Sequence, residues 1–144
     1  MFTKLLIAFT LMAACVVLHA AGLTAAMRWL ERSLAALGSG SWRRLRLLIE
    51  VAGWTVLVHL VEITVWAAYY AGSGAMPDID SALYFSAVTY TTTGYGDLVL
   101  PEPWRLVGGI EALTGILMCG WSTGFFFAVV SQILTRTSAV AGEH

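Results

Sequence analysis

The chain has 144 residues, of which 58% are hydrophobic and only 12% are charged. So few charged residues cannot cover the surface of a water-soluble domain, and we therefore expect a membrane protein. The length allows one domain and leaves no room for a separate catalytic unit. The formal net charge of -1 and the clustering of the eight basic residues argue against a nucleic-acid partner.

Three apolar stretches are long enough to cross a bilayer as helices, and the chain is therefore predicted to be an all-α membrane protein. The stretches run from Leu5 to Met27, from Leu47 to Tyr70 and from Trp104 to Leu134. Residues 1–46 are predicted to form an N-terminal membrane helix and a basic cytoplasmic connector. The helix is expected to continue as a short amphipathic segment from Trp29, which Gly38 to Ser41 terminates. Residues 47–144 are predicted to form a second unit around the other two spans.

The distribution of basic residues predicts the orientation in the membrane. Five arginines and one glutamate lie between the first two spans, whereas residues 72–104 contain no Lys or Arg. The positive-inside rule places the first connection and the C-terminus in the cytoplasm, and the N-terminus and residues 72–104 outside. The small size and the preference for Arg over Lys favour the inner (plasma) membrane of a bacterium.

Residues 1–21 also permit a different interpretation, as a cleaved signal peptide that ends at Ala20-Ala21 or a lipoprotein signal that ends at Cys15. Cleavage would place the five arginines outside, against the charge distribution, so a retained helix is favoured. Cys15 and Cys119 both lie in apolar runs far apart in sequence, which predicts packing rather than a disulfide or a CxxC site.

The segment between the second and third spans contains a short apolar run, Ala82 to Tyr90, that cannot cross a membrane. Pro77 followed by Asp80 or Ser81 as N-cap predicts the start of a helix, which then stops at a Thr- and Gly-rich stretch. Non-helical backbone at membrane depth is tolerated only where it is buried in protein or lines a watery cavity. A re-entrant helix and loop at this position therefore imply a pore.

The sequence Thr92-Thr93-Gly94-Tyr95-Gly96-Asp97 resembles the potassium-channel selectivity filter. The chain is similar over about 60 residues to small prokaryotic potassium channels of the tetrameric pore-loop family, whose simplest members lack the first helix. The resemblance implies an outer helix at 47–71, a pore helix at 80–91, a filter at 92–97 and an inner helix at 104–135. It implies a homotetramer in the lipid bilayer that conducts K+ passively, with no enzymatic activity and no cofactor.

By the same resemblance the K+ ligands are the carbonyls of Thr92, Thr93, Gly94 and Tyr95, with the Thr92 hydroxyl closing the innermost site. Glycine reaches positive φ at low cost, so Gly94 and Gly96 allow alternate carbonyls to turn toward one axis.

The filter is expected to be supported from behind. Asp97 is expected to anchor it, with the Tyr84 hydroxyl as a partner, because Tyr84-Phe85 stands where many relatives have tryptophans. Thr93 also departs from the family, in which Val or Ile is usual. This departure should be mild, because the ligand is a carbonyl.

Two carboxylates, Glu62 and Glu111, are predicted at filter depth inside the second and third spans. We expect them to bond behind the filter or to Tyr90 or Thr91, as functional or purely structural groups. Gly115 and Gly120 are either gating hinges or close-packing residues.

Two alternative functions stay open. His59 and Glu62, three residues apart, are compatible with a membrane metal-binding protein. The chain could also be a non-conducting accessory subunit of a channel. Arg43, Arg44 and Arg46 are expected in a loop, so no voltage sensor is predicted.

Overall fold

The computed structural model describes residues 2–35 and 41–141. Its elements are α1 (Phe2–Ala35), α2 (Ser41–Gly72), α3 (Ile79–Tyr90), the 3-10 turn η1 (Glu102–Trp104) and α4 (Arg105–Ala141). Helices α1, α2 and α4 are each long and apolar enough to cross a membrane. The predicted all-α membrane fold with three spanning helices is thereby confirmed.

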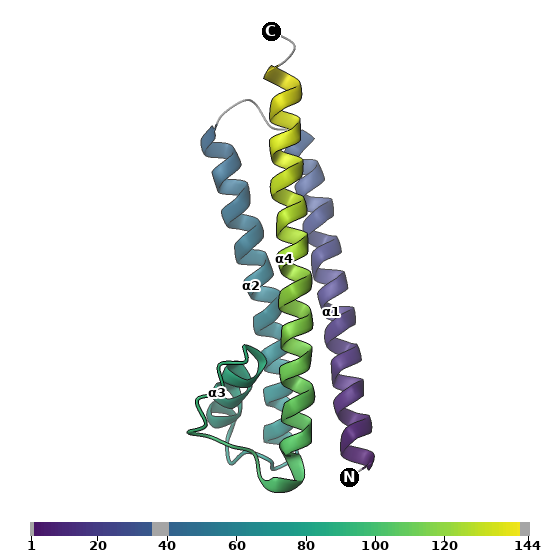
Figure 1. Cartoon of the computed structure of the whole chain (residues 1–144), viewed down its shortest axis with the longest axis vertical. Coiled ribbons are helices and arrows are strands. Elements are labelled where there is room, and N and C mark those ends of the chain that lie inside the picture. The colour runs from purple at the N-terminus through teal and green to yellow at the C-terminus, as the bar shows by residue number, and fades with distance from the viewer. Residues whose placement is uncertain (1, 36–40, 142–144) are drawn as a thin grey trace.

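The three long helices lie side by side, and α3 packs against α2 and α4 at the end of the bundle where α1 begins (Figure 1). We call this the loop end. Lys4 on α1 stacks over the ring of Trp104 there, with its ammonium 3.6 Å from the ring centroid. Helix α4 ends at the opposite end of the bundle, as three spans require.

Proline determines where the helices can start, because its ring excludes it from a helix interior. Pro77 precedes α3, and Pro101 and Pro103 precede α4. Asp78, in an extended conformation, caps α3 by accepting a bond of 2.7 Å from the Ser81 amide. The prediction of Asp80 or Ser81 as the cap is wrong, because Asp78 is the residue whose side chain reaches the free amide three positions on.

The helices extend beyond the apolar runs that predict them. Helix α2 begins at Ser41, so Arg43, Arg44 and Arg46 lie in its first turns and not in a loop as expected. Arg46 pairs with Glu50 one turn later at 2.8 Å, and arginine favours helices, so hydropathy underestimates the helix length.

The last helix also differs from its predicted bounds. Helix α4 begins at Arg105 because Glu102–Trp104 forms a 3-10 turn, and it continues to Ala141. Residues 36–40, which include most of the predicted Gly38 to Ser41 terminator, lie outside the described residues.

Two buried apolar clusters stabilise the bundle, one at the loop end and one at the far end. The loop-end cluster is centred on Trp66, Tyr70 and Phe85. The far cluster is formed by Leu30, Leu34, Leu47, Val51, Val129 and Ile133. Along α1, α2 and α4 the buried polar residues His19, Glu62 and Ser122 fall between the two clusters, in what we call the polar layer.

Candidate functional site

The loop after α3 is tied to the helix by backbone hydrogen bonds. The Thr92 amide donates to the Thr89 carbonyl at 2.9 Å, and the Gly94 amide donates to the Val88 carbonyl at 3.0 Å. The Thr91 hydroxyl donates to the carbonyl of Ala87 at 2.7 Å. The first residues of the loop are therefore held against the last turn of α3.

Between Thr92 and Gly96 every second residue has a left-handed backbone. The φ angles of Thr92, Gly94 and Gly96 are 59°, 53° and 78°. In an extended strand successive carbonyls point to opposite sides, and a change of hand at alternate residues turns them toward a common side. The positive φ expected at Gly94 and Gly96 is confirmed.

Thr92 is one of the residues singled out from the sequence, but its backbone conformation was not foreseen. A β-branched residue with positive φ is rare and costs on the order of 1–3 kcal/mol. Among the described non-glycine residues only Thr92 has this conformation. Backbone strain of this kind is found where the surrounding structure enforces it, here through the bond from the Thr92 amide to α3.

The loop is uncovered in the single chain. Residues 91–99 are all exposed, and Tyr95 is 73% exposed, whereas Tyr90 and Leu100 on either side are buried. Because exposed non-helical backbone is not tolerated against lipid, this segment needs water or other protein chains around it.

A hydrogen bond connects the far side of the loop to α3. The Tyr84 hydroxyl donates to Asp97 Oδ2 at 2.6 Å, and the Leu98 amide donates to Oδ1 at 3.0 Å. The Tyr84 bond is the main cause that lowers the pKa of Asp97, and the same bond raises the pKa of Tyr84. The expected contact is present, and it joins an ionised carboxylate to a protonated phenol.

Glu111 connects three helices at the loop end. It is fully buried on α4, and its Oε2 accepts a bond of 2.8 Å from the Tyr70 hydroxyl on α2. Its Oε1 accepts a bond from the Ser86 hydroxyl on α3. The carboxylate therefore contacts the pore-helix segment as expected, but through Ser86 instead of Tyr90 or Thr91.

Glu62 forms a second buried connection. Its Oε2 accepts a bond from the hydroxyl of Tyr90, the last residue of α3, and its Oε1 lies 3.1 Å from His19 Nδ1. The predicted contact with Tyr90 is confirmed, while the partner on α1 was not foreseen. The functional role of both carboxylates stays a prediction.

Gly115 lies where α4 crosses the end of α3. A Cβ atom at this position would overlap the carbonyl oxygen of Tyr90 and lie 2.7 Å from its carbonyl carbon. Gly120, one turn later, has open space. Helix α4 is continuous through both residues, so Gly115 has the close-packing role, and the hinge role stays a prediction.

Residues 54–132 match the family model described as Ion channel. The match covers more than half of the chain, so the protein belongs to this ion-channel family. It includes the second half of α2, all of α3, the loop and most of α4, whereas α1 lies outside it. No curated protein and no solved structure gives a significant match.

Proposed function

We propose that this protein is a potassium-selective channel that conducts K+ passively across the membrane. The observation that carries the proposal is the alternating positive φ at Thr92, Gly94 and Gly96 in an exposed, braced loop. K+ entering a pore exchanges its water shell for oxygens, and a row of inward carbonyls supplies them. The carbonyls of Thr92, Thr93, Gly94 and Tyr95 are the ligands, and the Thr92 hydroxyl closes the innermost site.

The channel is proposed to be a homotetramer. One loop supplies one side of a carbonyl ring, and a closed ring requires copies of the chain around a common axis. The exposure of residues 91–99 supports this assembly, because the neighbouring chains and the ion pathway would cover them. Gly96, Asp97 and Tyr84 then support the filter from behind.

The loop end is proposed to face the outside of a bacterial plasma membrane, with the C-terminus in the cytoplasm. This end carries Asp78, Asp80, Asp97 and Glu102, while residues 72–104 contain no Lys or Arg. Carboxylates at a pore mouth raise the local cation concentration, an effect that salt screens.

Ion flux into liposomes that contain only this protein tests the proposal. We expect K+ flux that Ba2+ blocks and that exceeds Na+ flux at least tenfold. Equal K+ and Na+ flux would overturn selectivity, and silence from a verified tetramer would favour the accessory-subunit alternative.

A matched pair of glycine variants tests whether the K+ flux passes through the loop. Gly94→Ala places a side chain at φ 53°, which costs roughly 1–2 kcal/mol and distorts the carbonyl row. Gly53→Ala adds the same methyl group to an open position on α2. We expect Gly94→Ala to lose at least tenfold in K+ flux and Gly53→Ala to keep it.

A further inference from the structure

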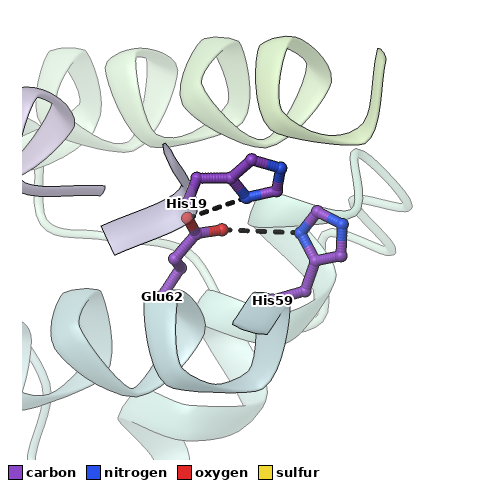
Figure 2. Close-up of side chains that lie close together, drawn as sticks. All are labelled: His19, His59 and Glu62. Carbon is purple, nitrogen blue, oxygen red and sulfur yellow. Dashed lines mark hydrogen bonds and ion pairs between the residues drawn. The ribbon is translucent and has the colours of Figure 1, made fainter. Parts of the chain in front are cut away.

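Three side chains that can bind metal ions meet in the polar layer, outside the loop. His19 on α1 and His59 and Glu62 on α2 each contribute one ligand atom, and these atoms lie within 4.8 Å of one another. Both imidazole rings are directed at the carboxylate (Figure 2). The sequence contains the His59 and Glu62 pair, and the fold adds His19 as a third ligand.

Each imidazole nitrogen lies close to a different oxygen of the carboxylate, at separations near those between the ligand atoms of a small divalent ion. His19 Nδ1 lies 3.1 Å from Glu62 Oε1, and His59 Nδ1 lies 3.4 Å from Glu62 Oε2. Zn2+ binds nitrogen and oxygen at about 2.0–2.2 Å, which places tetrahedral ligand atoms roughly 3.3–3.5 Å apart. Two imidazoles and one carboxylate are a usual zinc donor set, with a fourth position for water or the Tyr90 oxygen, 3.0 Å from His59 Nδ1.

Ser122 on α4 orients both histidines for this role. Its Oγ lies 3.0 Å from His59 Nε2 and 3.1 Å from His19 Nε2. A hydroxyl oxygen can accept both N–H bonds, but its single hydrogen can serve only one ring as donor. When both rings donate from Nε2, both Nδ1 atoms carry lone pairs, which is how metal-bound histidines are usually held.

The side chains of this cluster have one donor hydrogen fewer than the number of close contacts between them. Five close contacts join His19, His59, Glu62, Tyr90 and Ser122 in a ring. Two neutral imidazoles and two hydroxyls supply four hydrogens when the carboxylate is ionised. One pair of acceptors must therefore face each other unless a further cation, a proton or a metal ion, lies between them.

We propose that His19, His59 and Glu62 bind one divalent transition-metal ion of the Zn2+ class within each subunit. Convergence of three ligand atoms favours a metal ion over a proton, because a proton bridges only two. The negative carboxylate offsets part of the charge of the buried ion. The His59 side chain is 17% exposed in the single chain and offers the route of entry.

The ion would act on the pore through Tyr90. The Tyr90 hydroxyl shares Glu62 with the metal, and Tyr90 ends the helix that holds the loop. Bound Zn2+ is therefore expected to change K+ flux at least twofold. This consequence rests on the proposed channel function, whereas binding of the metal does not.

Metal binding to the purified full chain tests the site. After treatment with chelator, the protein is equilibrated with micromolar Zn2+, or with Co2+ as a spectroscopic probe. We expect one ion per chain and the visible absorption of four-coordinate Co2+. His19→Gln and His59→Gln should each weaken binding at least tenfold, and Ser122→Ala about 10–100-fold. His144→Gln, which removes the remaining histidine, is the control and should bind normally.

A replacement ligand separates loss of the site from loss of the fold. His59→Cys keeps three ligands and should add a thiolate-to-Co2+ charge-transfer band, which a misfolded chain does not produce. Failure of the wild-type protein to bind Zn2+, or retention of the ion by a folded His19→Gln His59→Gln double variant, would overturn the proposal. Stoichiometric binding without ion flux would support the site and count against the channel function alone.

Discussion

The hydroxyl of Tyr90, the last residue of α3, donates a hydrogen bond to the buried carboxylate of Glu62 on α2. The backbone of the same tyrosine packs against Gly115 on α4. The residue at which α3 gives way to the loop is thus held by α2 through its side chain and by α4 through its main chain. The start of the loop therefore contacts both spans, and each contact can be tested separately.

Tyr90→Phe removes only the hydroxyl. Loss of one hydrogen-bond partner from a buried carboxylate costs about 1–3 kcal/mol, so we expect a lower Tm in detergent and a lower ratio of K+ to Na+ flux. Tyr69→Phe is the control, because the Tyr69 hydroxyl takes no part in this contact. Equal thermal stability and selectivity in the two variants would show that the Glu62 contact does not support the loop.

Gly115→Ala tests the contact with α4. Alanine is favoured over glycine in a helix by about 1 kcal/mol, so Gly120→Ala, at an open position, should be neutral or stabilising. At Gly115 the added methyl group meets the Tyr90 main chain, and overpacking costs roughly 1–3 kcal/mol or more. Thermal unfolding should therefore rank Gly115→Ala below the wild type. A Gly115→Ala protein as stable as Gly120→Ala would contradict the close packing.

Local patterns in the sequence predict much of this fold and part of the site. Hydropathy locates the three spans, and Pro77, Pro101 and Pro103 delimit the segments between them. The contact of Glu62 with the pore-helix segment is predictable, since the helical rise places this residue at the depth of the loop. Tyr84 and Asp97 are predictable partners from the family resemblance.

Contacts that depend on how distant helices align are not predictable in this way. His19 meets Glu62 across 43 residues, and nothing in either apolar run fixes the register of α1 against α2. Ser122 is one of several small polar residues in a long apolar helix, so nothing in the sequence marks it as the partner of two imidazoles. The positive φ of Thr92 could not be predicted either, because this conformation is normally expected only at glycine.

The bond between Tyr84 and Asp97 predicts a pH dependence. Because this bond lowers the pKa of Asp97, the folded state is favoured above the ordinary aspartate pKa, and this stabilisation disappears as the pH falls through the lowered value. Tyr84→Phe raises the pKa of Asp97 toward its ordinary value. We therefore expect K+ flux measured against external pH to fall at a higher pH in this variant.

Ser81→Ala is the control for that titration. Bonds from Ser81 lower the pKa of Asp78 at the other end of α3, and they do not involve Asp97. The variant should leave the acid midpoint of the flux in place. Equal midpoints for Tyr84→Phe and the wild type would mean that Asp97 does not control the loop.

Glu111→Gln tests the second buried carboxylate. Each oxygen of Glu111 accepts one hydroxyl bond, from Tyr70 and from Ser86, whereas glutamine offers one oxygen and one NH2 group. The hydroxyl of Tyr70 or of Ser86 then faces the glutamine NH2 group and has lost its acceptor, at a cost of about 1–3 kcal/mol. We expect a lower Tm and altered ion selectivity, while Glu102→Gln at an exposed position of the same end leaves both unchanged. Wild-type stability and conduction in Glu111→Gln would show that the bonds to α2 and α3 do not require two acceptor oxygens at this position.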